Sequence, residues 1–211
     1  MDSEIVSLKP LYDYAKEKHG ENPSECKSMA PRIFEEGRDF GEKTKNLLLD
    51  IPDNVPGFFL FGKFSNNGEW LGMNLCHSAQ LGKYAIEKIK TRRAFIFRCF
   101  YGCDELKRAC MDYFPEKGTD YWKEWQKAFS YAGSTYLIWL SLPDFKLEEI
   151  KALNRELATM GIAEGRIRED LIEPKTQGGR AMLKFKEALN TLNPEDRVEP
   201  DYIRNSDYSC E

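Results

Sequence analysis

Two short apolar stretches, FFLFGKF and EWLGMNL, are separated only by Ser-Asn-Asn-Gly. Both are rich in the aromatic and branched residues that favour strands. The Asn66-Asn67-Gly68 sequence favours the left-handed backbone conformations that a tight turn needs. The pattern therefore predicts a β-hairpin with strands over residues 57–64 and 69–75.

Two later stretches also have the character of strands. AFIFRCFY, residues 94–101, is an almost continuous apolar run, which is typical of a strand covered on both faces. STYLIWLSL, residues 134–142, is a fourth predicted strand, which Pro143 and Asp144 bring to an end.

Apolar residues at helical spacing follow the hairpin and again follow the strand predicted over residues 134–142. After the hairpin, Ser78 is a plausible N-cap of a helix whose buried stripe comprises Leu81, Tyr84, Ala85, Ile86 and Ile89. After Pro143, the segment 146–161 places on one face Leu147, Ile150, Leu153 and Leu157, and Gly161 ends it. Further helices are expected over residues 8–20, 31–51, 103–114, 119–133, 163–174 and 180–194, with a flexible joint at 175–179 and a polar tail from 195.

This order of elements predicts an α+β fold with a small central mixed or antiparallel sheet, which contains the hairpin and is flanked by helices. The length of 211 residues favours one domain with an elaboration. We expect a helical N-terminal extension over residues 1–50 and a core over 51–165 with a helical insertion at 103–133. C-terminal helices and the polar tail would occupy 166–211.

Composition narrows the class of protein. Hydrophobic residues make up 41% of the chain, which is too many for a disordered protein, and the net charge of −4 disfavours a surface that grips phosphates everywhere. No apolar run reaches 18 residues and the first ten residues do not resemble a signal peptide, so we expect no membrane partner. The six cysteines contain no Cys-x-x-Cys pair; we expect reduced thiols in a cytoplasmic protein.

The hairpin also carries a motif. Gly57-Phe58-Phe59 on its first strand is followed, after ten residues, by Trp70-Leu71-Gly72 on its second, and a proline precedes the first strand. With a helix next, and with YLIWLSLPDFKLEEIKALNRELATMG as a last strand and helix, residues 51–165 resemble the GIY-YIG nuclease superfamily. The resemblance implies hydrolysis of nucleic acid phosphodiesters assisted by Mg²⁺ or Mn²⁺.

The resemblance also assigns roles to individual positions, and each of them departs from the family pattern. The two family tyrosines fall on Phe59, which has no hydroxyl, and on Trp70, whose indole can only donate. The family arginine falls near Gln80, or near Lys83 and Tyr84 if the loop is longer, and Lys83 keeps the charge without the bidentate fork. The metal-binding glutamate falls on Asn154; a shifted register would bring Glu149 or Glu156, or Glu169 on the next helix, into its place. His77 or Lys63 could act as the base, and the alternative for His77, which the sequence favours, is a loop or capping histidine.

A dense basic run follows the hairpin and comprises Lys83, Lys88, Lys90, Arg92, Arg93 and Arg98. With Lys63, the residues Lys88, Lys90, Arg92 and Arg93 could bind DNA phosphates, and the alternative is a solvated helix face.

Two functions stay open. One is a nucleic-acid-associated protein, active as an endonuclease only if the altered positions still work. The other is a catalytically inactive binding or protein-interaction module, which uses a concave patch between Phe59, Trp70 and a helix.

Overall fold

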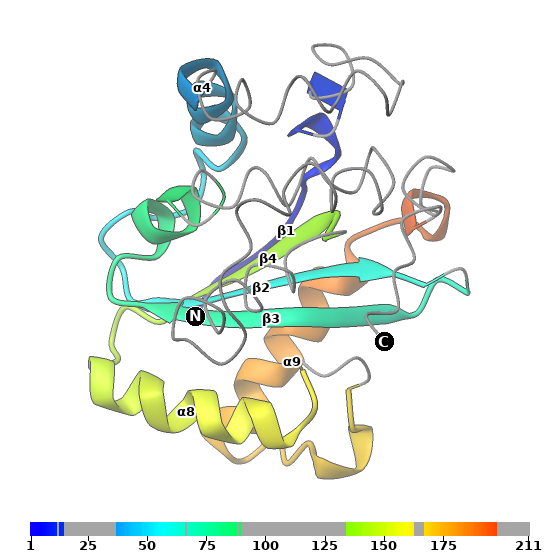
Figure 1. Ribbon diagram of the computed structural model, residues 1–211. Helices are drawn as coiled ribbons and strands as arrows, with labels where there is room; N and C mark the ends of the chain where they lie inside the picture. The colour runs from blue at the N-terminus through cyan, green and yellow to red at the C-terminus, as the bar shows by residue number, and fades with distance from the viewer. Residues whose placement is uncertain are drawn as a thin grey trace, which may run out of the picture.

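The computed structural model describes residues 1–11, 13–14, 37–65, 67–87, 89, 134–162 and 167–197. Within these ranges the chain forms a four-stranded sheet in the order β1-β4-β2-β3 (Figure 1). The strands are β1 (Ser3–Ser7), β2 (Gly57–Phe64), β3 (Trp70–Ser78) and β4 (Tyr136–Ser141). Every pairing is antiparallel, and helices cover the sheet, so the predicted α+β class is confirmed.

The central strands are buried because both faces of the sheet are covered. All six residues of β4 and seven of the eight residues of β2 are buried, which fits their nearly continuous apolar sequences. Alternate residues of these strands enter two separate apolar clusters. Phe59 and Trp139 belong to one cluster, whereas Phe58 and Leu140 belong to the other.

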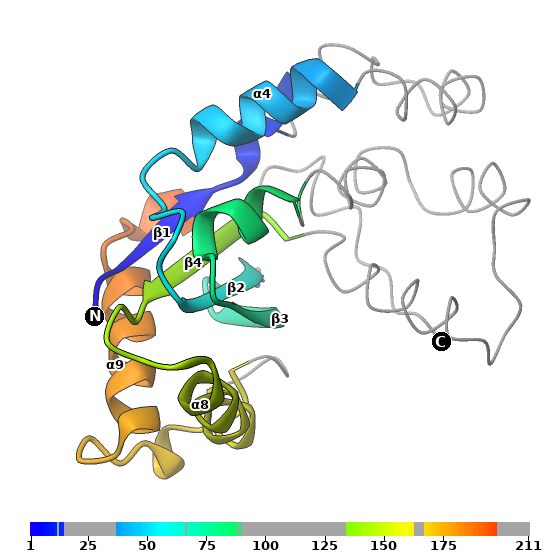
Figure 2. The ribbon, with the colours of Figure 1, turned by 90° about the vertical axis from the view of Figure 1, so that its left-hand side faces the viewer.

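Helices α4 (Gly37–Leu47) and residues 81–87 lie on one face of the sheet, and α8 (Leu147–Thr159) and α9 (Gln177–Asn190) lie on the other (Figure 2). On the second face Ile150, Leu153 and Leu157 of α8 are buried as predicted, whereas Leu147 is 41% exposed. The helix α9 packs on β1, β4 and α8. No helix within the described ranges is long and apolar enough to cross a membrane.

The N-terminal segment corrects one prediction. Residues 3–7 do not belong to a helical extension; they form β1, which pairs with β4 so that Ile5 faces Ile138. Only Ile5 and Val6 are apolar in this five-residue strand, too few for an alternating pattern to be recognised. Of the second predicted helix, 31–51, the described part contains α4.

The second hairpin strand is longer than predicted. Pairing with β2 continues through His77, opposite Phe58, to Ser78, opposite Gly57. Ser78 therefore ends a strand and does not cap the helix directly. Its hydroxyl accepts from the Gln80 N–H at 2.9 Å, and Leu81 begins the helix with its N–H bonded to the Val55 carbonyl.

The connection between α8 and α9 corrects two more predictions. The helix expected over 163–174 is reduced, in its described part, to the 3₁₀ turn η2 (Glu169–Leu171), and the Arg168 N–H returns to the Met160 carbonyl. The glycines of the expected flexible joint lie in the first turn of α9. A close contact explains why a glycine occupies position 179, because a Cβ there would come within 1.9 Å of the Glu173 carbonyl oxygen.

The α9 helix itself, the α8 helix ending at Gly161 (φ 74°) and the hairpin are confirmed. The predicted strand 94–101, the insertion 103–133 and the tail beyond the 3₁₀ turn η3 (Pro194–Arg197) lie outside the described residues. The division into a core and two extensions stays a prediction.

Candidate functional site

The two aromatic residues that were expected to line one site lie on opposite faces of the sheet. Phe59 packs against Phe61 at 5.6 Å and Tyr84 at 5.8 Å between ring centroids, on the face covered by residues 81–87. Trp70 packs against Phe64 at 5.4 Å, in the cluster that contains α8 and α9. Strand alternation separates them, because Phe59 pairs with Cys76 and Trp70 with Phe64. The prediction of a shared patch between Phe59 and Trp70 is therefore wrong.

Trp70 has a packing role that explains the glycine beside it. A Cβ at Gly62 would come within 2.3 Å of the Trp70 ring, so the indole lies directly against the Gly62 backbone. Trp70 is only 8% exposed, and its indole nitrogen has no hydrogen-bond partner. Gly62 thus makes room for a core side chain at the point where the β2–β3 register shifts.

The two glutamates proposed as metal ligands both hold backbone N–H groups. Glu149 Oε2 accepts from the Lys146 N–H at 2.7 Å and closes the N-terminus of α8. Glu156 Oε2 accepts from the Gly178 N–H at 2.9 Å, while the Thr176 hydroxyl accepts from the Gly179 N–H at 2.9 Å. Glu156 and Thr176 together satisfy the N-terminus of α9. The glutamates stand seven residues apart on α8, about 10 Å along its axis, so they do not form one metal site.

No group of three or more His, Cys, Asp or Glu side chains that could hold a metal ion occurs in the part of the chain that the structure describes. The Mg²⁺ or Mn²⁺ site therefore stays a prediction, and Glu149, Glu156 and Asn154 do not form a ligand set for it. Asn154 is half-buried on α8, and its buried Oδ1 has no hydrogen-bond partner. Asn154 lies on the helix that packs against the Trp70 face of the sheet, and both residues have a buried polar atom without a hydrogen-bond partner.

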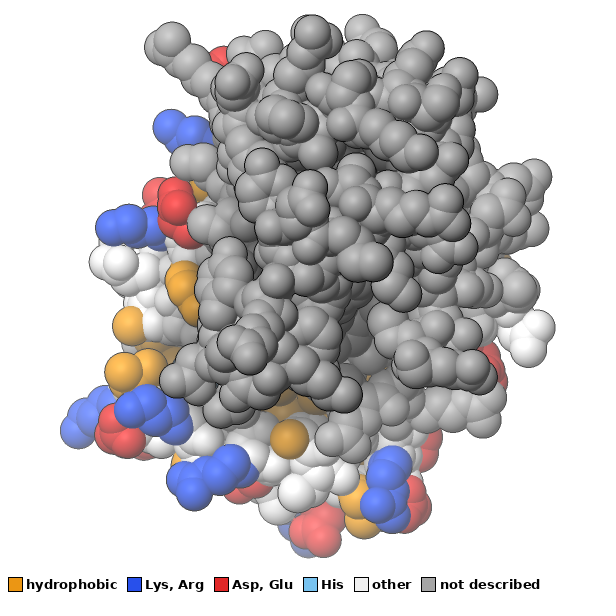
Figure 3. All heavy atoms as spheres, in the orientation of Figure 1, with side chains coloured by type: hydrophobic (Ala, Val, Ile, Leu, Met, Phe, Trp, Pro, Cys, Tyr) orange, Lys and Arg blue, Asp and Glu red, His pale blue; other side chains and the backbone are white. Residues whose placement is uncertain are grey.

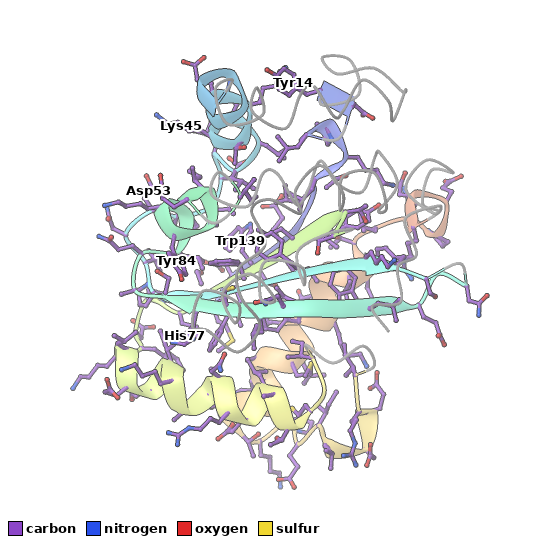
Figure 4. The ribbon with its side chains drawn as sticks, viewed as in Figure 1. Tyr14, Lys45, Asp53, His77, Tyr84 and Trp139 are labelled. Atoms are coloured by element: carbon purple, nitrogen blue, oxygen red, sulfur yellow. The ribbon has the colours of Figure 1, made fainter. Side chains whose placement is uncertain are left out.

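The proposed base and the proposed cation are also separated by the sheet. His77 lies between β3 and α8, with its ring centroid 6.3 Å from that of Phe58 (Figure 4). Lys83 is exposed on the helix 81–87, which covers the other face, where Figure 4 places Tyr84 and Trp139. His77 and Lys83 therefore belong to elements on opposite faces of the sheet, and their joint action on one phosphate stays a prediction.

Of the other basic residues predicted to bind DNA, the structure describes Lys63 and leaves four outside the described residues. Lys63 is half-buried in β2 opposite Leu71. The side chains of the other predicted DNA contacts lie outside the described residues: Lys88, Lys90, Arg92 and Arg93. Their role as a phosphate-binding surface stays a prediction.

Charges on the α8–α9 face are mixed rather than of one sign, as the adjacent blue and red side chains in the lower part of Figure 3 illustrate. Lys151 pairs with Glu148 at 2.8 Å, and Lys186 of α9 pairs with Glu169 of η2 at 2.6 Å. The hydrogen bond from Lys151 lowers the pKa of Glu148 below its ordinary value. Such exposed pairs contribute little to stability and do not mark a site.

Two further buried donors lie outside the residues singled out from the sequence. Trp139 Nε1 and Arg197 Nε are buried without a hydrogen-bond partner. A tryptophan within a continuous apolar strand is the only signal that could have pointed to Trp139, because its N–H has few acceptors within a sheet core.

Comparison of the chain with protein-family models, with curated protein sequences and with solved structures gave no match.

Proposed function

We propose that this chain is a nucleic-acid-binding module that does not cleave its ligand. One observation carries the non-catalytic part of the proposal: the residues assigned to the reaction are distributed over two faces of the sheet and are used by the fold. Phe59 and Trp70 are core residues on opposite faces, and Glu149 and Glu156 hold helix N-termini.

The nucleic-acid part rests on the resemblance and on the basic run. The order hairpin, helix 81–87, strand β4 and helix α8 agrees with the order that the resemblance requires. Lys83, the first cation of the run, is exposed to solvent on the helix that follows the hairpin. A local run of this kind can bind phosphates although the whole chain carries a net charge of −4.

Incubation of the protein with supercoiled plasmid in Mg²⁺ or Mn²⁺ tests the absence of cleavage. We expect no nicked or linear product. Cleavage that is lost in Lys83→Ala, Glu149→Ala or Glu156→Ala would overturn the non-catalytic assignment. Cleavage that survives all three substitutions would also overturn it, and would place the active site elsewhere in the chain.

Fluorescence anisotropy with a labelled duplex at several salt concentrations tests the ligand class. Replacing Lys83, Lys88, Lys90 and Arg92 by alanine should weaken binding at least tenfold and reduce the salt dependence. A control that replaces the exposed or half-buried lysines Lys146, Lys151, Lys175 and Lys184 on the α8–α9 side removes the same charge and should weaken binding less. No salt-sensitive binding by the unmodified chain would favour a protein-interaction module instead.

A further inference from the structure

The last described turn of the chain, η3 (Pro194–Arg197), lies beside three aromatic residues at the turn end of β2 and β3. Phe64 contacts Trp70 at 5.4 Å and Tyr136 at 5.2 Å between centroids, both with edge-to-face geometry. The three rings are 1–8% exposed. Figure 1 shows η3 as the orange-red turn near the arrowhead of β2.

Polar contacts of two residues hold η3 in place. The Asp196 carbonyl accepts from the Tyr136 hydroxyl at 2.6 Å and from Lys9 Nζ at 3.2 Å. Arg197 Nη2 donates to the carbonyls of Leu189 and Leu192 at 3.2 and 3.1 Å, near the C-terminus of α9. The Arg197 guanidinium also lies over the Phe64 ring, 5.7 Å from its centroid.

The turn contributes almost no apolar burial of its own. None of its four residues is buried, and Pro194, Glu195 and Asp196 are exposed. By contrast, the rings of Phe64 and Tyr136 belong to a large buried cluster held by β4, α8 and α9. Release of η3 therefore breaks a few hydrogen bonds and one cation–π contact while the main cluster keeps its packing.

The position that η3 occupies in the structure also leaves two buried polar groups without hydrogen-bond partners. Arg197 Nε and Trp70 Nε1, on two residues that both contact Phe64, are buried without a partner. A buried donor without an acceptor disfavours the arrangement that buries it, and movement of η3 would let water reach Arg197. The hydrogen bonds that hold η3 in place are thus opposed by the free-energy cost of burying Arg197 Nε without an acceptor, and opening of the turn removes this cost.

We propose that residues 194–197 form a latch, which opens and closes over the Phe64 end of the sheet without unfolding of the sheet. The contacts of Asp196 and Arg197 set the fraction of molecules in which the latch is closed. This inference is independent of the proposed nucleic-acid binding. The latch links the position of residues 194–197 to the solvent access of Phe64 and Tyr136, the two rings that the turn contacts.

Hydrogen exchange followed by mass spectrometry of the full chain tests the latch. Arg197→Ala and Tyr136→Phe each remove one anchor, and Arg180→Ala, which replaces an exposed arginine in the first turns of α9, is the control. We expect amides of residues 191–197 to exchange at least tenfold faster in both anchor variants. Peptides from β2 and β4 should be unchanged in all three.

Two results would overturn the latch. If exchange in 191–197 is unchanged in both anchor variants, these contacts do not hold the turn. If β2 and β4 accelerate by the same factor as 191–197, the turn opens only when the whole sheet unfolds. An Arg197→Lys variant, which keeps a positive donor, should show intermediate exchange rather than the full effect of alanine.

Discussion

At the scale of the residue, the pairing of aromatics with glycines in the hairpin has a packing explanation. The sequence shows a glycine near each aromatic but not which one makes space for which ring. Gly62 lies under the Trp70 indole, and Gly57 lies against the Leu140 carbonyl, where a Cβ would approach to 2.1 Å. Both glycines allow close approach of a neighbouring element, and neither needs a left-handed backbone.

Gly62→Ala should lower the free energy of unfolding by about 1–3 kcal/mol, the usual cost of overfilling a packed core. Urea unfolding measures this loss. In a Trp70→Phe background the penalty of Gly62→Ala should be smaller, because the smaller ring removes the clash with the indole but not the one with the Leu71 carbonyl. Strictly additive effects of the two substitutions would contradict the assigned contact.

Glu156→Ala should lower the free energy of unfolding by about 1 kcal/mol, because the Gly178 N–H at the start of α9 loses its charged acceptor. Glu148→Ala, in the first turn of α8, removes an exposed pair with Lys151 and a favourable charge at the helix N-terminus, but no backbone hydrogen bond; it should lower the free energy of unfolding by no more than about 0.5 kcal/mol. Equal effects of the two substitutions would show that Glu156 has no capping role.

At the scale of the element, the sequence predicts long periodic segments well and short ones poorly. The α8 helix and the hairpin follow directly from apolar spacing and turn residues. The strand β1 has no such pattern, because its pairing with β4 and its packing against α9 make Ser3–Ser7 extended. The turn η2 was mistaken for a helix because its charged and apolar residues are compatible with helical spacing, whereas tertiary contacts return the chain to α8.

The neighbouring residues Ile5 and Glu4 test β1. Ile5 is 9% exposed in the cluster with α9, whereas Glu4 is exposed. Ile5→Ala should lower the free energy of unfolding by about 2 kcal/mol, and Glu4→Ala should change it by no more than about 0.5 kcal/mol. Chemical denaturation of both variants gives the comparison, and an Ile5→Ala variant as stable as Glu4→Ala would exclude β1 from the folded core.

At the scale of the whole molecule, the candidate site could not be predicted because its members are far apart in the sequence. Which face of the sheet each residue occupies depends on the register of the hairpin and on the side to which each helix returns. A register shift opposite Phe61 and Gly62, where β3 has one extra residue between Gly72 and Asn74, changes the alternation within the hairpin. Single residues could be assigned to strands and helices, but the distribution of Phe59 and Trp70 over opposite faces of the sheet could not.

Metal binding gives a test at this scale. Any change in thermal midpoint on addition of Mg²⁺ or Mn²⁺ should be the same in the unmodified chain and in Glu149→Gln with Glu156→Gln, because both carboxylates are used as helix caps. EDTA should have no greater effect on one than on the other. A cation response that disappears only in the double variant would restore these glutamates as ligands.

The strand order has a consequence for how the chain reaches its native state. The central pair is made by β2 and β4, and β1 at the N-terminus pairs with β4 as well, so that Ser3 meets Leu140. Pairing of such distant positions requires closure of a long loop, and the entropic cost of this closure comes before the contacts stabilise the chain. Such pairing therefore slows folding. During synthesis, the hairpin can form early, but among the described strands β1 pairs with β4 alone, and this pairing must wait until β4 has left the ribosome.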